Sequence, residues 1–301
     1  MLKNNEKFNI NGVILLDKDI NKSSNKALQE VKRLFLAKKA GHTGSLDPNA
    51  TGLLPICFGQ ATKLAQFLLD ADKRYVLTAQ LGASTNTFDI DGEITQTASF
   101  NNITNKDVLT VIKKYIGEIK QIPPMFSALK NKGKPLYKLA RKGIKVARKP
   151  RNIKIYAINF LNLNNGVLKL DVLCSKGTYI RSLVNDIGEE LGCYAYVKNL
   201  RRTQIAQFKI NNSYSFDKLQ AIKNNNHLLD ILIPLEDMLP NLDSFYLDKE
   251  NSQKIMFGQT IEIKNNNNIS DNVRLFNNHK KFIAIGSIKD ANHIAPKRLF
   301  V

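Results

Sequence analysis

Up to about residue 239, apolar residues occur either in short runs, as in strands, or every three or four positions, as in helices. Together the two patterns predict a mixed domain of helices and strands. Short apolar runs at 9–16, 53–58, 75–81, 152–162, 167–174 and 194–205 predict strands. Apolar residues that recur every three or four positions predict helices at 24–35, 62–69, 105–115, 179–191 and, with an interruption at 224–226, 213–239. The helix at 105–115 is expected to turn Val108, Leu109, Ile112 and Tyr115 inward.

Both ends of the chain have a different pattern. The first eleven residues are polar and are expected to form a tail. Pro240-Asn241 marks a boundary, after which short strand-like runs alternate with Asn-rich turns. We therefore expect a tail at 1–11, a main domain at 12–239 and a small all-β module at 240–301, with Asn265–Asn268 at a loop tip.

One internal segment, Lys130 to Lys154, contains no acidic residue. Such a charge run is typical of a disordered tail, a solvated face or a segment that grips phosphates. Its position between predicted strands favours a loop that becomes ordered on RNA or DNA. Its basic residues are Lys130, Lys132, Lys134, Lys138, Arg141, Lys142, Lys145, Arg148, Lys149, Arg151 and Lys154.

The charge of the whole chain also indicates a nucleic-acid partner. Forty-five Lys and Arg against 26 Asp and Glu give a net charge of +19 and a pI near 9.7. Binding to an anionic membrane is the competing interpretation, but no helix with a basic face and large apolar residues opposite is evident. We find no apolar run near the roughly 18 residues of a membrane span, and no secretory signal.

Three distant cysteines and four ungrouped histidines argue against disulfides and structural zinc. The same cysteine usage fits a reducing cytoplasm, which is the location we expect. No dinucleotide-binding, phosphate-loop or deaminase motif is present, so we expect neither a metal nor an organic cofactor. Asp89 to Glu93 is acidic but lacks the remaining ligands of a calcium loop, which favours a hairpin turn.

The stretch Gly41 to Gly52 is the strongest candidate for chemistry. It places three glycines, Pro48, His42 and a single carboxylate, Asp47, within twelve residues. The alternative is a surface turn in which the aspartate bonds its own backbone. A hydrolase triad of Ser45, His42 and Asp47 is disfavoured, because known triads draw their members from distant segments.

With these residues in view, the chain resembles the TruB family of bacterial tRNA pseudouridine synthases. The matching blocks occur in order from about residue 12 to residue 203. They are GVILLDK at 12–18, SNxALxxVKR at 24–33, KKAGHTGSLDP at 38–48, ATGLLP at 50–55, GQATK at 59–63, KRY at 73–75, GxxTxTxDxxG at 82–92, QxPPxFSA at 121–128, KGTYIR at 176–181 and LRRT at 200–203.

The resemblance implies a pseudouridine synthase fold, which is an α+β fold with a largely antiparallel central sheet and a C-terminal PUA-like module. It implies isomerisation of uridine-55 in the T-loop of tRNA by a monomer, without a cofactor or an obligate protein partner. Asp47 matches the catalytic aspartate, Arg181 its paired arginine and Tyr75 the tyrosine that stacks on the target base.

Other matched positions are expected to bind the substrate. His42 matches a residue that fills space in the remodelled T-loop, whereas Lys63, Tyr179 and Leu200 match substrate-pocket positions. The basic segment from Pro123 to Arg151 falls where the family has its RNA-gripping thumb loop. Departures at Asp19, Ser45, Asn49 and Gln60 alter loop shape but remove no group that the reaction needs.

Isomerisation of uridine to pseudouridine breaks the bond between ribose C1′ and base N1 and joins C1′ to C5. A carboxylate held in a fixed direction suits this reaction. Asp47 can add to C1′, attack C6 or take a sugar proton to form a glycal, and the sequence leaves all three routes open. An adjacent Arg181 is expected to direct the carboxylate through a bidentate contact. The target base must also be flipped out of its stack. After C1′ joins C5 a proton must leave C5, and Tyr75 is a candidate to help, so it is counted with Asp47 and Arg181 as catalytic.

The rival interpretation is a non-catalytic RNA-binding or RNA-chaperone protein, which explains the charge but not a single aspartate held between glycines and a proline. DNA binding is disfavoured because we find no groove-reading helix with clustered Arg, Asn and Gln.

Overall fold

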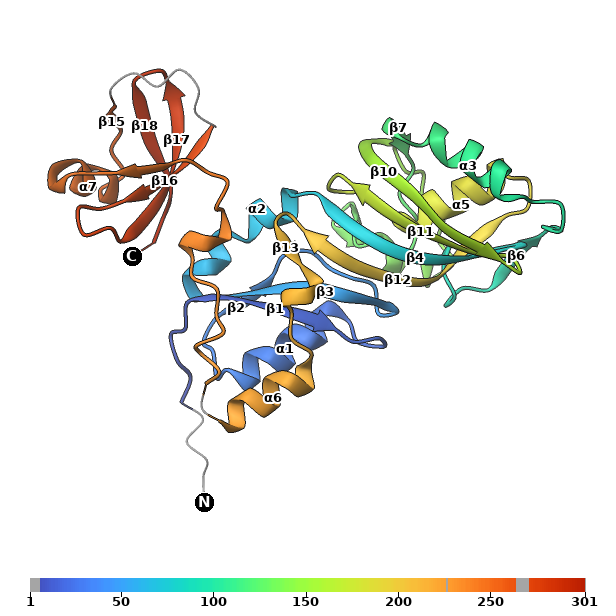
Figure 1. Ribbon diagram of the computed structural model, residues 1–301, viewed down its shortest axis with the longest axis horizontal. Coiled ribbons are helices and arrows are strands. Elements are labelled where there is room, and N and C mark those ends of the chain that lie inside the picture. The colour runs from blue at the N-terminus through green and yellow to red at the C-terminus, as the bar shows by residue number, and fades with distance from the viewer. Residues whose placement is uncertain (1–5, 226, 264–270, 301) are drawn as a thin grey trace.

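A computed structural model describes residues 6–225, 227–263 and 271–300, and its largest element is a nine-stranded mixed sheet (Figure 1). Neighbouring strands pair antiparallel except β3 and β12, which pair in parallel. The main order is β1 (Gly12–Lys18), β3 (Ala50–Phe58), β12 (Ala195–Ile205), β4 (Lys73–Leu81), β11 (Val167–Cys174), β10 (Arg151–Asn164) and β7 (Gly117–Gln121). β2 (Ala40–His42) pairs with β3, and β13 (Phe208–Lys209) pairs with β12.

The strands at the β1 end are buried on both faces, which explains their nearly continuous apolar sequences. Ile14 and Leu16 of β1 pack in a cluster with α1 (Ser24–Leu34) and α6 (Phe216–Asn224). The alternate residues Val13 and Leu15 pack on the other side with the helical segment formed by η1 (Gly59–Lys63) and α2 (Ala65–Asp70).

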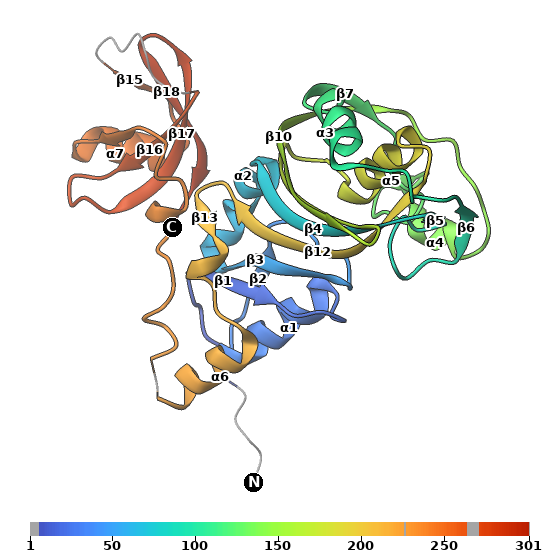
Figure 2. The same cartoon turned by 45° about the vertical axis from the view of Figure 1, so that its right-hand side comes forward.

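The other half of the sheet curves over α3 (Asn105–Lys114) and α5 (Ile180–Glu190), as Figure 2 shows. The expectation for α3 was wrong at one position. Val108, Val111 and Ile112 form its buried stripe, whereas Leu109 is 40% exposed because it lies at the edge of that stripe.

The parallel pairing of β3 and β12 depends on a glycine. Gly52 lies opposite Arg202 and has a φ of +103°. A Cβ atom there would come within 2.3 Å of the Arg202 carbonyl oxygen, so no other residue allows the two backbones this approach. This close pairing joins the strand that follows the Gly41–Gly52 stretch to the strand that carries Leu200.

The C-terminal module contains a five-stranded sheet in the order β14 (Ser244–Tyr246), β16 (Asn272–Phe276), β17 (Phe282–Asp290), β18 (His293–Leu299) and β15 (Ile261–Glu262). The expectation of an all-β module was wrong, because α7 (Lys249–Met256) begins after the Asp248 cap and packs against this sheet. Asn265–Asn268 lie outside the described residues.

The module is packed against the main domain rather than linked loosely to it. Phe276, Phe282 and Phe300 form stacked and tilted ring pairs within the cluster that also contains Val13 and Leu15. Arg274 of β16 holds the connecting segment by donating to the carbonyl oxygens of Glu236, Pro240 and Leu242.

Three local expectations are corrected. Among the described residues of 213–239, helix is confined to α6 and a short 3-10 turn at Glu236–Met238, because Ile233 instead pairs with Val13 of β1. Residues 6–11 are not a free tail, since the Phe8 backbone bonds to Leu36 and Lys38. The basic segment begins with a small hairpin of β8 (Lys130–Asn131) and β9 (Lys134–Pro135), followed by α4 (Leu136–Ala140).

The predicted fold class is confirmed: the protein has an α+β main domain with a mixed, largely antiparallel sheet and a small C-terminal module. Within the described residues, no helix has the length and apolar character needed to cross a membrane.

Candidate active site

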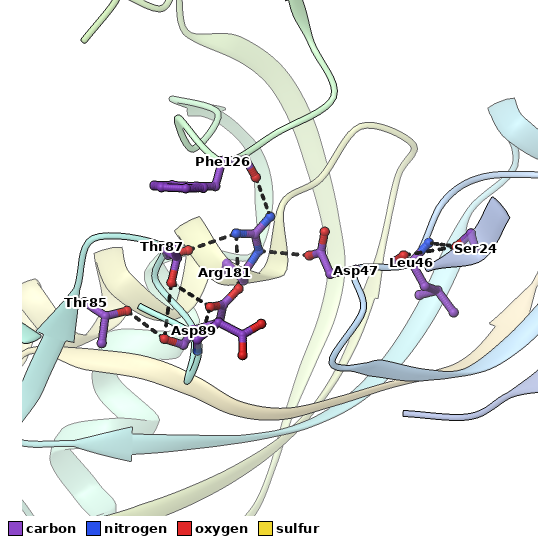
Figure 3. A network of polar contacts seen from close by, with 9 residues as sticks. Ser24, Leu46, Asp47, Thr85, Thr87, Asp89, Phe126 and Arg181 are labelled. Atoms are coloured by element: carbon purple, nitrogen blue, oxygen red, sulfur yellow. Dashed lines mark hydrogen bonds and ion pairs between the residues drawn. The ribbon is translucent and has the colours of Figure 1, made fainter. Parts of the chain in front are cut away.

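Arg181 and Asp47 meet at the middle of the large sheet, although 134 positions separate them in the sequence. Arg181 lies in the first turn of α5, and its Nε atom is 3.0 Å from Asp47 Oδ2 (Figure 3). The arginine side chain is only 7% exposed, whereas the aspartate is 46% exposed. The pair therefore consists of a buried cation that holds a carboxylate accessible to a substrate.

The same guanidinium binds a second carboxylate that the sequence analysis did not assign to the site. Arg181 Nη1 lies 3.2 Å from Asp89 Oδ2 and donates to the Thr87 carbonyl oxygen at 2.9 Å. Its Nη2 donates to the Phe126 carbonyl oxygen at 2.8 Å. The expected bidentate contact with Asp47 is replaced by a contact through Nε, because both Nη atoms are engaged elsewhere (Figure 3).

Asp89 lies in the connection between β5 (Ala83–Thr85) and β6 (Ile94–Thr97), so the predicted hairpin turn is confirmed. The turn also aims the carboxylate at Arg181. The Thr87 hydroxyl donates to Asp89 Oδ1 at 2.6 Å, and the Asp91 backbone N–H donates to the same atom at 3.1 Å. Burial raises the pKa of Asp89, while the Thr87 hydroxyl and the Arg181 charge oppose that rise.

The stretch that carries Asp47 is fixed through the backbone of alternate residues. Arg202 donates to the Gly44 carbonyl oxygen at 3.1 Å. The Ser24 hydroxyl donates to the Leu46 carbonyl oxygen at 3.0 Å and accepts from the Leu46 N–H at 2.7 Å. Lys18 Nζ donates to the Pro48 carbonyl oxygen at 3.2 Å. These contacts hold the residues around Asp47 and leave its carboxylate free for Arg181 and a substrate.

A pocket of about 180 Å³ opens beside this pair. Its lining combines side chains from the large sheet, the start of α5 and the first residues of the Pro123–Arg151 segment. The lining residues are Ser45, Leu46, Asp47, Tyr75, Ser127, Ala128, Thr178, Tyr179, Ile180, Arg181 and Leu200. The structure thus brings together five residues selected from the sequence, namely Asp47, Tyr75, Tyr179, Arg181 and Leu200.

Tyr75 and Leu200 come from the adjacent strands β4 and β12 and provide apolar surface in the pocket. Burial raises the pKa of the Tyr75 phenol, although interaction with the Arg202 guanidinium opposes the rise. The phenol is therefore protonated at neutral pH. Arg202 is itself 1% exposed and donates to the Leu53 carbonyl oxygen at 2.8 Å.

Two other predicted residues lie outside the pocket lining. His42 ends β2, and its Nδ1 accepts from the Gly44 N–H at 3.4 Å; burial and the charge of Arg202 lower its pKa. The assignment of Lys63 to the pocket is not supported, because its Nζ donates to the Leu299 carbonyl oxygen of the C-terminal module at 2.8 Å. This contact joins residues far apart in the sequence, and local pattern gave no signal for it.

The basic residues predicted to grip RNA extend from the pocket edge into the segment that contains β8, β9 and α4. All six are exposed, and in the parts of the chain that the structure describes none forms an ion pair with an acidic side chain. They are Lys130, Lys132, Lys134, Lys138, Arg141 and Lys142. The residues described include no group of three or more His, Cys, Asp or Glu suited to a metal ion.

We predict that Ser24→Ala loosens the backbone beside Asp47, because the buried N–H and carbonyl of Leu46 both lose their partner. The expected loss of stability is about 1–3 kcal/mol, with faster hydrogen exchange at the Leu46 amide. Ser23→Ala is the matched control, since Ser23 caps α1 through the Lys26 N–H. It should cost about 1 kcal/mol without changing exchange at Leu46. Equal exchange at Leu46 in both variants would contradict this account.

Comparison with known proteins gives one family over nearly the whole chain. Residues 32–180 match the N-terminal domain of TruB family pseudouridylate synthases, residues 181–240 the C-terminal domain of tRNA pseudouridylate synthase B, and residues 244–300 the C-terminal domain of pseudouridine synthase II TruB.

Individual relatives agree with this result. The tRNA pseudouridine synthase B of Haemophilus influenzae (strain PittEE) is 47% identical over 293 residues, which are 96% of this chain and 95% of that protein. The protein of the same name from Shewanella denitrificans is 46% identical and covers 97% and 95% of the two chains. A chain from a crystal structure of a Cbf5-Nop10-Gar1 complex superposes with a TM-score of 0.72 at 25% identity, covering 96% of this chain and 84% of that one. The chain belongs to the TruB family of pseudouridylate synthases.

Proposed function

We propose that this protein isomerises uridine-55 in the T-loop of tRNA to pseudouridine, acting on the T-arm as a cytoplasmic monomer. The names of the relatives, tRNA pseudouridine synthase B, support a tRNA substrate. The observation that carries the proposal is the half-exposed Asp47 carboxylate, held 3.0 Å from a buried guanidinium at the edge of a pocket. A pocket that only bound RNA would not require this arrangement.

The pocket is suited to receive a base that has left its stack. Flipping a nucleotide costs a few kcal/mol, and stacking on an aromatic ring returns about 1–3 kcal/mol per base. Tyr75 and Leu200 supply the surfaces between which the pyrimidine lies. A half-exposed His42, beside the Gly44 backbone, occupies the space that the flipped nucleotide leaves.

Asp47 then acts on the flipped nucleotide. Attack at C1′, attack at C6 and removal of a sugar proton all need a carboxylate oxygen close to both the ribose and the base. The backbone contacts at Gly44, Leu46 and Pro48 fix the approach of that oxygen. Arg181 sets the direction of the Asp47 carboxylate through its Nε atom. After C1′ joins C5, the C5 proton must leave, and Tyr75, which lines the pocket, is the candidate group to help remove it, although burial raises the pKa of its phenol and the Arg202 guanidinium opposes that rise.

The exposed lysines and arginines next to the pocket supply most of the sequence-independent affinity for RNA. Their charges are free to meet phosphates because they have no acidic partners among the described residues. Ser127 and Ala128, at the beginning of this segment, line the pocket itself. Binding of the RNA backbone and entry of the base are therefore coupled through one segment.

The central experiment measures tritium release from tRNA that carries 5-tritiated uridine. We predict release by the unaltered protein and a loss of about a thousandfold or more in Asp47→Asn, at unchanged tRNA affinity. The control is Asp19→Asn, which removes an exposed carboxylate whose one ion pair among the described residues is a 3.8 Å contact with Lys22. The control should keep its activity.

A non-catalytic RNA-binding protein is the alternative. It predicts tight tRNA binding without tritium release in any of the three proteins, and that result would overturn the proposed function.

A second prediction concerns the salt dependence of tRNA binding. Replacing Lys132 and Lys134 by Gln should lower the slope of log K against log salt concentration by up to about 2, because each phosphate contact contributes about 0.7–0.9. Replacing Lys106 and Lys113, two exposed lysines of α3, removes the same charge and should leave the slope nearly unchanged. Equal changes in the two double variants would indicate a diffuse charge effect and contradict a local grip.

A further inference from the structure

Ser127 is a buried polar residue whose side chain the structure leaves without a partner. It is 5% exposed, and among the described residues no group lies in hydrogen-bonding geometry with its Oγ atom. A buried hydroxyl without a partner costs about 1–3 kcal/mol. Buried polar groups in native proteins are otherwise almost always paired, so an unpaired one needs an explanation.

The position of this hydroxyl indicates what it could bind. Ser127 lines the pocket that also contains Asp47, Tyr75 and Leu200. Much of that pocket is apolar, with Leu46, Ala128, Ile180 and Leu200 in its lining. The Tyr179 hydroxyl is close enough to Ser127 for the two groups to interact, so the two hydroxyls form an uncharged polar area in a pocket whose charged groups are Asp47 and Arg181.

The backbone of Ser127 is held firmly. Its N–H donates to the Met125 carbonyl oxygen at 3.0 Å, and its own carbonyl accepts from the Tyr137 N–H at 3.0 Å. The preceding carbonyl, that of Phe126, accepts from Arg181 at 2.8 Å. The hydroxyl is therefore positioned by the same guanidinium that positions Asp47, which is the preorganisation expected of a substrate contact.

The ligand follows from the chemistry of a pyrimidine. Tyr75 and Leu200 can cover the two faces of the ring, but its edge carries carbonyl oxygens that lose their water on entering the pocket. A phosphate group is a poor match for this position, because the nearby Arg181 charge is already shared by Asp47 and Asp89. An uncharged hydroxyl matches an uncharged carbonyl oxygen.

We propose that Ser127 is a substrate-contact residue that donates a hydrogen bond from its hydroxyl to a carbonyl oxygen on the edge of the flipped uracil. This inference rests on the proposed function. It assigns recognition of the base to a residue at the beginning of the basic segment. The RNA-gripping segment thereby takes part in selecting the base as well as in holding the backbone.

The test compares Ser127→Ala with the unaltered protein on three T-arm stem-loop RNAs, with uridine, 2-thiouridine or 4-thiouridine at the target position. A thiocarbonyl is a weak acceptor. We expect kcat/KM for the uridine RNA to fall about tenfold in Ser127→Ala, in keeping with the loss of one hydrogen bond. The loss should disappear with one of the two thio-substituted RNAs and persist with the other.

Thermal unfolding separates this role from a structural one. Because the Ser127 hydroxyl makes no well-formed hydrogen bond to a described residue, despite its nearness to the Tyr179 hydroxyl, Ser127→Ala should leave the Tm nearly unchanged. Ser99→Ala, at an exposed serine outside the pocket, is the control and should leave kcat/KM unchanged for all three RNAs. A lowered Tm in Ser127→Ala with an equal loss of activity on all three RNAs would overturn the inference.

Binding measurements keep the inference distinct from the proposed function. In the Asp47→Asn background, Ser127→Ala should weaken equilibrium binding of the uridine RNA severalfold, and one thio-substituted RNA should again abolish the difference. Equal binding of all three RNAs with and without the serine hydroxyl overturns the inference even if tritium release is observed. Absence of tritium release from the unaltered protein overturns the proposed function, whatever the binding data show.

Discussion

The contact on which the site depends is the one between the Arg181 guanidinium and its four oxygen partners. Burying a charged group is costly unless it is paired and hydrogen-bonded. Arg181 meets this requirement with Asp47, Asp89, the Thr87 carbonyl and the Phe126 carbonyl. These partners belong to three segments that approach α5 from different parts of the chain. One side chain therefore holds the Asp47 loop, the β5–β6 hairpin and the beginning of the basic segment in a fixed relation.

Further buried cations organise the surroundings without using a carboxylate. Lys18 is 1% exposed and donates to three carbonyl oxygens, and burial lowers its pKa to about 8. Arg202, also 1% exposed, binds the carbonyl oxygens of Gly44 and Leu53. Because these cations bind backbone oxygens, they shape the Gly41–Gly52 stretch while Asp47 keeps its exposed side for the nucleotide. The close pairing of Gly52 with Arg202 fixes the far end of the same stretch.

Much of this arrangement could be predicted from the sequence, and the limits have a physical cause. Spacing of apolar residues predicted α1 and α5 well, since each buries one face against the sheet. The glycines and the proline around Asp47 indicated a shaped loop. Asp89 was assigned only to a turn, because a local pattern shows a turn but not the distant arginine that the turn faces.

The other corrections have the same origin. Lys63 lies beside a strand end of the C-terminal module, and Ile233 leaves its predicted helix to pair with β1. Both depend on contacts across more than 200 residues of sequence, which helical spacing does not record. The unpartnered hydroxyl of Ser127 is likewise a property of the folded pocket alone.

The most direct test of the central claim is the turnover of Asp89→Asn on tRNA, compared with that of Asp91→Asn. Both substitutions lie in the same hairpin connection, but only Asp89 contacts Arg181 through its side chain. The account requires that Arg181 positions Asp47 only while Asp89 holds the guanidinium. Losing one charge-assisted hydrogen bond costs about 1.5–3 kcal/mol, so Asp89→Asn should lower kcat about 10- to 100-fold. Asp91→Asn should keep full activity, and tRNA affinity should change little in either variant. Full activity in Asp89→Asn would show that Asp47 is positioned without this contact and would contradict the account.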